Sequence, residues 1–106
     1  MNRRLIRYRT KPGRADENRR LIEAVFRELH EKAPEGVGYL ALSLEDGSFL
    51  HLVSLEGDVN PIPKLEAFHK FQSEIEERCV EEPQAAAVTV VGNYRMLGEP
   101  VSGGAK

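Results

Sequence analysis

The spacing of apolar residues changes several times along this chain, and each change marks a predicted element. Apolar and polar residues alternate from residue 4 to residue 10, which predicts a β-strand. Apolar residues at spacings of one, three and four then predict a helix over residues 14–32, and Pro34 and Gly36 end it. The chain therefore opens with a strand followed by a helix.

Two further strands are predicted over residues 37–45 and 48–56, joined by Asp46-Gly47. This dipeptide favours a type I′ turn, in which both central residues take a positive φ. The two segments are therefore expected to form a hairpin. A loop with two prolines follows, because proline cannot donate to a strand ladder.

The second half of the chain predicts one more helix and one more strand. Apolar residues spaced by three and four predict the helix over residues 63–79, and Glu82-Pro83 ends that segment. The last strand is expected over residues 85–97, with Gly92 as a bulge. Residues 98–106 are rich in glycine and without periodicity, so we expect a flexible tail.

The order β-α-β-β-α-β predicts a single α+β domain over residues 1–97 with a ferredoxin-like fold. In this fold two helices cover one face of a four-stranded antiparallel sheet. The predicted strands are apolar on both faces, with Leu40, Leu42 and Leu44 on one side of their strand and Tyr39 and Ala41 on the other. The second face needs a cover, and we expect a symmetric homodimer.

Composition narrows the function classes. The 106 residues are 41% hydrophobic and 30% charged, which is typical of a globular domain. A formal net charge of −2 and a third strand without Lys or Arg argue against nucleic-acid binding. The single cysteine, Cys79, excludes an intramolecular disulfide and fits a reducing compartment. With no signal-peptide pattern and no long apolar run, we expect a cytoplasmic protein without membrane association.

The chain also resembles a known group. The element order, the Lys11-Pro12-Gly13 turn, the doubly apolar sheet and a last strand ending in Gly92-Asn93-Tyr94 are similar to the dimeric α+β-barrel superfamily over residues 3–97. Its antibiotic-biosynthesis-monooxygenase-like domains are the nearest match. The resemblance implies a homodimer with a ligand cleft between sheet and helices. Some members oxygenate polyketide-type aromatics without a cofactor, others bind or degrade haem, and many have no assigned activity.

Two histidines are the candidate catalytic residues. His51 lies in the middle of a predicted strand, where a near-neutral imidazole could act as a general base, or could be an ordinary core histidine with satisfied hydrogen bonds. His69 lies beside the apolar stripe of the second predicted helix, and in haem-degrading relatives a histidine of this helix binds the iron. Those relatives also use a tryptophan near the end of the third strand and an asparagine within the first strand. This chain has no tryptophan, and its Asn2 precedes the predicted first strand. We therefore expect no cofactor and no metal site.

The candidate ligand-binding residues include three tyrosines, which combine a large apolar surface with one polar group, as is typical of small-molecule pockets. They are Tyr8, Tyr39, Phe68, Gln72, Tyr94 and Arg95. The plainer interpretation of the tyrosines is ordinary packing in a sheet. 

The sequence thus predicts a small-molecule-binding domain for an aromatic or polyketide-like ligand. By extension it would be a cofactor-independent monooxygenase, with His51 or His69 accepting a proton while Tyr39 or Tyr94 orients the ring. The alternative is a non-catalytic homodimeric ligand-binding or interaction module. Polar groups around a cavity would favour the enzyme, and a filled core would favour the module.

Overall fold

The computed structural model of the chain describes residues 2–97. Its elements are β1 (Asn2–Thr10), α1 (Ala15–Lys32), β2 (Val37–Ser43), β3 (Ser48–Leu55), a 3₁₀ turn (Ile62–Lys64), α2 (Glu66–Gln72), α3 (Ile75–Arg78) and β4 (Cys79–Ala87). The predicted tail, residues 98–106, lies outside the described residues.

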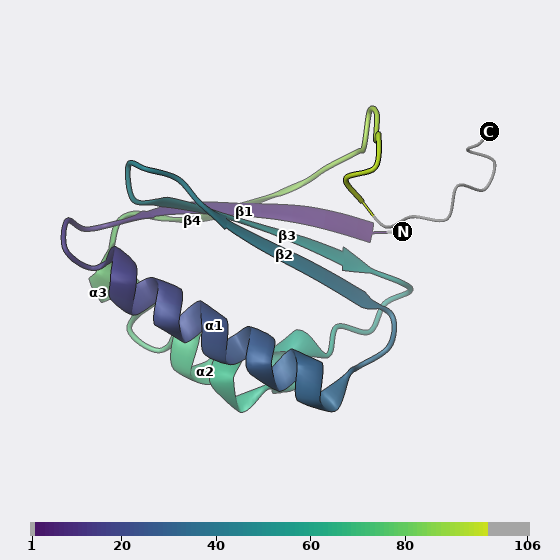
Figure 1. Cartoon of the computed structure of the whole chain (residues 1–106), viewed down its shortest axis with the longest axis horizontal. Helices are drawn as coiled ribbons and strands as arrows, with labels where there is room; N and C mark the ends of the chain where they lie inside the picture. Colours follow the sequence, from purple (N-terminus) through teal and green to yellow (C-terminus); the bar gives the residue numbers. More distant parts are fainter. Residues whose placement is uncertain (1, 98–106) are drawn as a thin grey trace.

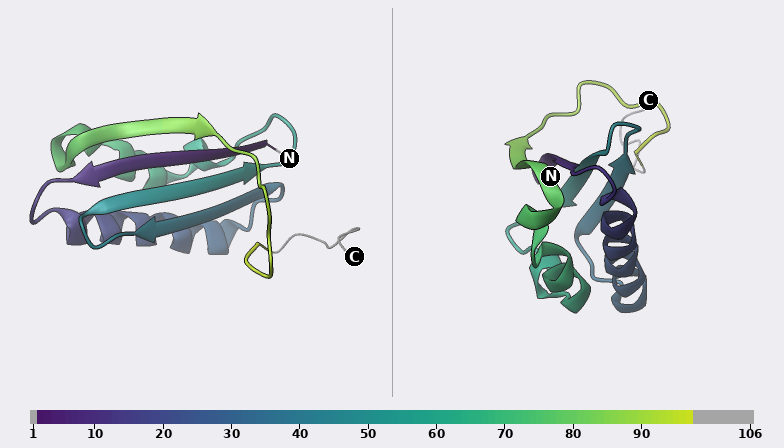
Figure 2. Two further views of the ribbon diagram at one scale, coloured as in Figure 1. Left: turned by 90° about the horizontal axis from the view of Figure 1, so that it is seen from above. Right: turned by 90° about the vertical axis from the view of Figure 1, so that its left-hand side faces the viewer.

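The four strands form one sheet in the order β2-β3-β1-β4, and all neighbours are antiparallel. The helices lie together on one face of this sheet, and the other face is left open (Figures 1 and 2). This arrangement confirms the predicted ferredoxin-like fold. The core lies between the sheet and the helices, where Tyr8 and Phe49 pack against Val25 of α1 and Phe71 of α2.

The hairpin is present, but its predicted turn type is wrong. Gly47 has a φ of 86°, whereas Asp46 is not among the described residues with positive φ. The Gly47 N–H donates to the Leu44 carbonyl at 3.2 Å, and the Asp46 carboxylate accepts from the Ser48 N–H at 2.9 Å. A type I turn followed by a left-handed glycine fits these bonds. The Asp46 carboxylate thus accepts from the Ser48 N–H, which in a type I′ turn would donate to a backbone carbonyl instead.

The second helix is not continuous, which corrects the prediction of one helix over residues 63–79. It is divided into a 3₁₀ turn, α2 and α3, and Glu74 takes a left-handed φ of 63° between the last two. The Arg78 guanidinium donates to the Phe71 carbonyl at 2.6 Å and to the Ser73 carbonyl at 3.1 Å. These carbonyls lie at the C-terminal end of α2, where helix bonds are missing, so Arg78 completes the end of α2.

The last strand begins and ends earlier than predicted. β4 runs over Cys79–Ala87 and contains Pro83, so Glu82-Pro83 does not end the segment as expected, and Gly92 lies outside the strand. Arg7 pairs with Gln84 and Arg9 with Glu81, so two residues of β4 oppose Tyr8 alone. Proline is tolerated in a β-bulge and on an edge strand. Pro83 lies in the bulge of β4, and β4 is an edge strand of the sheet. Residues 88–97 then leave the sheet on the side away from the helices (Figure 1).

Candidate functional site

A chain of hydrogen-bonded polar side chains crosses the interior between the sheet and the helices. It consists of Arg78 (at the end of α3), Asn18 (α1), Tyr8 (β1), His51 (β3) and Tyr39 (β2). Asn18 Nδ2 lies 2.7 Å from Tyr8 Oη, and Arg78 Nε lies 3.1 Å from Asn18 Oδ1. The two nitrogens of His51 are taken by tyrosines, Nε2 by Tyr8 Oη at 2.9 Å and Nδ1 by Tyr39 Oη at 2.6 Å. Five separate elements therefore meet in one network.

The sheet register brings the three rings together. Ile6 and Ala41 lie directly opposite His51 on the two neighbouring strands, so Tyr8 and Tyr39 are its diagonal neighbours on the helix-facing side. Diagonal neighbours are within reach when the side chains are aromatic. The ring centroids of Tyr8 and Tyr39 lie 5.3 Å and 5.6 Å from that of His51.

Burial keeps these three rings uncharged at neutral pH. His51 is 3% exposed, and loss of water lowers its pKa from 6.5 to about 4. Burial likewise raises the pKa of Tyr8 and of Tyr39 well above the usual value of 10. His51 is therefore a weak proton acceptor, and both of its nitrogens are already occupied.

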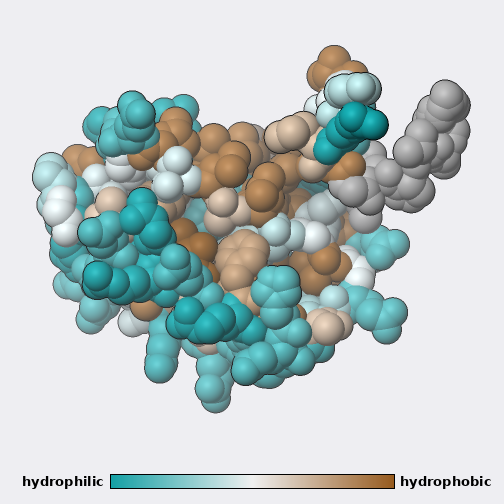
Figure 3. Space-filling view, viewed as in Figure 1, coloured by the Kyte–Doolittle hydropathy of each residue, from teal (hydrophilic) through white to brown (hydrophobic). Residues whose placement is uncertain are grey.

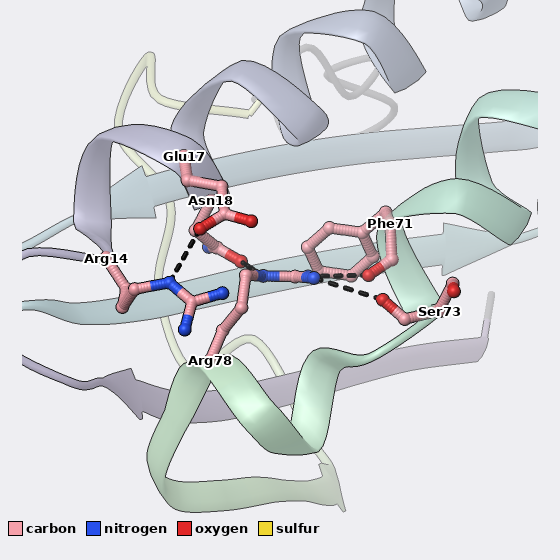
Figure 4. A network of polar contacts seen from close by, with 6 residues as sticks. All are labelled: Arg14, Glu17, Asn18, Phe71, Ser73 and Arg78. Carbon is pink, nitrogen blue, oxygen red and sulfur yellow. Dashed lines mark hydrogen bonds and ion pairs between the residues drawn. The ribbon is translucent and has the colours of Figure 1, made fainter.

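Arg78 is the deeply buried cation of this network, with 1% of its surface exposed. Its partners are the Asn18 amide oxygen and the two backbone carbonyls at the end of α2, and its guanidinium carbon lies 5.4 Å from the centre of the Phe71 ring. Figure 4 shows the guanidinium pointing from α3 towards these carbonyls, with the exposed Arg14–Glu17 pair beside it. Such a cation is tolerated because its donors face oxygens and its flat face meets an aromatic ring.

An apolar groove runs between α1 and the β2 edge of the sheet, and Phe26 stands in its middle. One hollow of about 320 Å³ lies between Phe26 and Phe49, with Arg19 and Glu23 among its lining residues. A second hollow of about 230 Å³ lies between Phe26 and Tyr39, towards the end of α1. The Phe26 and Tyr39 rings are 4.9 Å apart, so the wall of the groove is aromatic. Tyr39 joins this groove to the buried network.

The structure brings some of the predicted site residues together and separates others. Tyr8, Tyr39 and His51 meet in the network, and Phe68 packs against Phe71 at 6.0 Å beside them. The others lie apart from the network: His69 and Gln72 are exposed on α2, and Tyr94 and Arg95 are exposed beyond β4. Tyr94 is 81% exposed, and the Arg95 guanidinium lies 5.5 Å from its ring centre.

The sequence reading missed Asn18, Phe71 and Arg78 as members of the site. Asn18 lies four residues before Ile22 and seven before Val25, so it continues the buried stripe of α1. On the predicted continuous helix, Arg78 would lie seven residues after Phe71 and on the same face. A polar residue at a stripe position was the available signal, because such a residue must find a buried partner.

Two negative findings concern the described part of the chain. Within residues 2–97, no cluster of three or more His, Cys, Asp or Glu side chains is placed to hold a metal ion. In the same range, no helix has the length and apolar character needed to cross a bilayer.

No protein-family model matches this sequence, and no curated protein matches it. Solved structures do match the fold. The crystal structure of an antibiotic biosynthesis monooxygenase superposes with a TM-score of 0.67 at 14% identity, over 87% of this chain and 100% of the other. A protein of unknown function from Nitrosomonas europaea gives 0.68 at 13% identity, over 92% and 95% of the two chains. A conserved protein from Methanosarcina mazei Go1 gives 0.66 at 16% identity, over 82% and 89%.

This chain has the antibiotic biosynthesis monooxygenase fold. The resemblance first seen in the sequence is thereby confirmed for the fold of the single chain. At these identities the antibiotic biosynthesis monooxygenase fold carries no activity with it, so function has to be argued from the side chains.

The free energy of unfolding is expected to fall as the pH drops from about 6.5 to about 4, because of His51. In the unfolded chain the His51 imidazole is protonated near pH 6.5, whereas in the folded chain it is protonated only near pH 4. At about 1.4 kcal/mol per pKa unit, His51 contributes about 3 kcal/mol that is complete above pH 6.5 and lost towards pH 4. Urea unfolding at pH 7 and pH 4.5 measures this change.

The matched controls are His51→Gln and His69→Gln. His69 is exposed on α2 and outside the buried network, so its replacement should keep the part of the pH dependence that is due to His51. His51→Gln should have a lower free energy of unfolding than wild type at pH 7. It should also lose the part of the pH dependence that is due to His51. An identical pH dependence in wild type and His51→Gln would contradict the assignment.

Proposed function

We propose that this chain is a homodimeric domain that binds a small aromatic molecule in the groove between α1 and β2. The carrying observation is the pair of Phe26 and Tyr39 rings. Phe26 lines both hollows, Tyr39 lines the second, and the Tyr39 hydroxyl is joined to buried His51. Aromatic walls with a few placed polar groups are typical of ligand sites, which occupy roughly 300–1,000 Å³. Hollows of about 320 and 230 Å³ suit a molecule of one or two rings.

The open face of the sheet supports the homodimer. Leu40, Leu42 and Leu44 are 44%, 49% and 42% exposed, although they are large and apolar. The register places Leu5 and Leu52 in line with Leu40 across the same face. Figure 3 shows apolar side chains over the strands and polar side chains over the helices. An antiparallel sheet with an apolar outer face needs a cover, and a second copy is the simplest one.

Oxygenation of the bound molecule without a cofactor is the second candidate function. The observation favouring it is the fold shared with a structure named as an antibiotic biosynthesis monooxygenase. The side chains favour binding over proton removal, because both His51 nitrogens are occupied and its pKa is about 4. In this second function neither His51 nitrogen is free to take the proton directly, so the substrate would have to be acidic, such as a phenol or an anthrone.

A thermal-shift screen tests the binding proposal. The panel contains phenols, anthrones, haemin, flavin mononucleotide and simple anions. A ligand at one hundred times its dissociation constant adds about 2.7 kcal/mol, which shifts the melting temperature by several degrees at this chain length. We expect phenols or anthrones to give the shift, and oxygen uptake with the active compound then tests the second function.

Phe26→Ala and Leu21→Ala are the matched variants for this screen. Both remove a half-buried apolar side chain from α1, but only Phe26 lines the groove. Phe26→Ala should lose the ligand-induced shift, whereas Leu21→Ala should melt earlier and keep it. A flat response across the panel, or an undiminished shift in Phe26→Ala, would count against the groove as the binding site.

A further inference from the structure

In each hydrogen bond of the buried network, the donor is the group on the Arg78 side and the acceptor is the group on the Tyr39 side. Arg78 sets this direction. A guanidinium nitrogen can only donate, so the Asn18 atom at 3.1 Å from Arg78 Nε must be the amide oxygen. The amide nitrogen of Asn18 then faces Tyr8 Oη at 2.7 Å and donates to it. Turning the amide round would place two donors against each other inside the core, which is costly. The orientation of Asn18 is therefore determined.

The direction continues through Tyr8 to His51. Tyr8 is buried and has one hydroxyl proton, and its oxygen already accepts from Asn18. Its other partner is His51 Nε2 at 2.9 Å, so the proton is donated there. Nε2 is then an acceptor, and a neutral imidazole carries its single proton on the other nitrogen, Nδ1. That nitrogen lies 2.6 Å from Tyr39 Oη and donates to it.

Tyr39 is the last residue of this series, and its own hydroxyl proton is not used by the network. Its oxygen accepts from His51, so the proton is available to a further acceptor. Among residues 2–97 no second hydrogen-bond partner of the Tyr39 hydroxyl is found, and the ring lines the hollow beside Phe26. A donor at the wall of an apolar groove selects for an acceptor on whatever enters the groove.

We infer that Tyr39 is a specificity-determining hydrogen-bond donor for the groove, and that Asn18 and Arg78 are the positioning residues that keep it a donor. The ligand class is then an aromatic molecule with a carbonyl or oxyanion acceptor, in preference to one that has only N–H or O–H donors. This inference rests on the proposed function for the place of the ligand. The direction of the network stands on the buried contacts alone.

The first test is the tautomer of His51, measured by ¹⁵N NMR of the imidazole in the protein without ligand at pH 7. The expected state has the proton on Nδ1. A proton on Nε2 in the wild-type protein would overturn the direction of the network.

Asn18→Asp gives the opposite expectation while keeping the shape of the side chain. A carboxylate beside Arg78 can only accept, so Tyr8 would donate to it and accept from His51 Nε2. The proton of His51 is then expected on Nε2, and Tyr39 would donate to the free Nδ1 nitrogen. An unchanged tautomer in a folded Asn18→Asp protein would overturn the inference.

The second test uses three bicyclic probes of similar size, each titrated by NMR: 1-indanone, with an acceptor; indole, with a donor; and indane, with neither. The wild-type protein is expected to bind 1-indanone about 3- to 10-fold more tightly than indane, which is the range of one hydrogen bond. Tyr39→Phe and Asn18→Asp should bring the ratio of the affinities for 1-indanone and indane close to one.

The outcomes separate this inference from the proposed function. Equal affinity of wild-type protein for 1-indanone and indane would overturn the role of Tyr39 as a donor while leaving the groove as the site. Failure of all three probes to bind, with the His51 proton on Nδ1, would overturn the groove as an aromatic site and the ligand class with it, and the direction of the network would stand.

Discussion

Replacing Arg78 by alanine is expected to lower the free energy of unfolding by about 3–5 kcal/mol. The substitution leaves the Asn18 oxygen and the carbonyls of Phe71 and Ser73 without their buried donor, and each unsatisfied acceptor costs about 1–3 kcal/mol. The end of α2 loses the side chain that completes it at the same time. Since domains of this size are stable by about 5–15 kcal/mol, a loss of this size is a large share of the whole stability. Urea titration followed by circular dichroism at 10 °C measures the change.

Two further variants make the Arg78 result specific. Arg78→Lys keeps the positive charge and loses the planar fork of donors, so it should fall between wild type and Arg78→Ala. Arg14→Ala removes an arginine from the exposed pair with Glu17 and should leave stability nearly unchanged. If Arg78→Ala were as stable as Arg14→Ala, Arg78 would not be holding the break between α2 and α3.

Introducing a glutamate at Leu42 is expected to convert the proposed homodimer into a monomer. Leu42 lies on the open apolar face of β2 and is 49% exposed in the single chain. In a symmetric dimer the substitution buries two unpaired charges, one from each copy, and a buried unpaired charge costs about 2–5 kcal/mol or more. The two charges together should therefore raise the dissociation constant by a factor of about a thousand or more.

Light scattering after size exclusion at micromolar concentration measures the mass. The wild-type protein should have twice the chain mass of 11.9 kDa, and the Leu42→Glu variant should have the single mass. Arg27→Glu on the exposed side of α1 is the control, and it should remain dimeric. A single-chain mass for the wild-type protein would contradict the homodimer. It would also contradict the proposal that a second copy covers the open face of the sheet.

The first half of the chain could be predicted from the sequence because its signals are local. Alternation placed β1 and the hairpin strands, and the apolar stripe placed α1, with ends that differ from the observed ones by no more than two residues. Periodicity is read directly from neighbouring residues, since a strand repeats every two residues and a helix every 3.6. Alternation along β3 puts His51 and Phe49 on one face of the strand, and the structure shows this face against the helices.

The second half could not be predicted this well because its signals depend on distant residues. Pro83 argues against a strand locally, yet it is tolerated because β4 is an edge strand with a bulge opposite Tyr8. Residues 63–79 have a helical pattern, yet the helix breaks where Arg78 binds the carbonyls at the end of α2. Which strand becomes an edge and which carbonyl meets a guanidinium are decided only when the elements pack.

The sequence by itself therefore determined the order of the elements, the ferredoxin-like fold and the two-faced apolar sheet. The tertiary structure decided the site. Asn18, His51 and Tyr39 come from three different elements, and their contacts depend on the register of the sheet and on the place of α1 above it. Hydrogen bonds extend only about 3 Å, so a shift of one residue in register would have separated these groups.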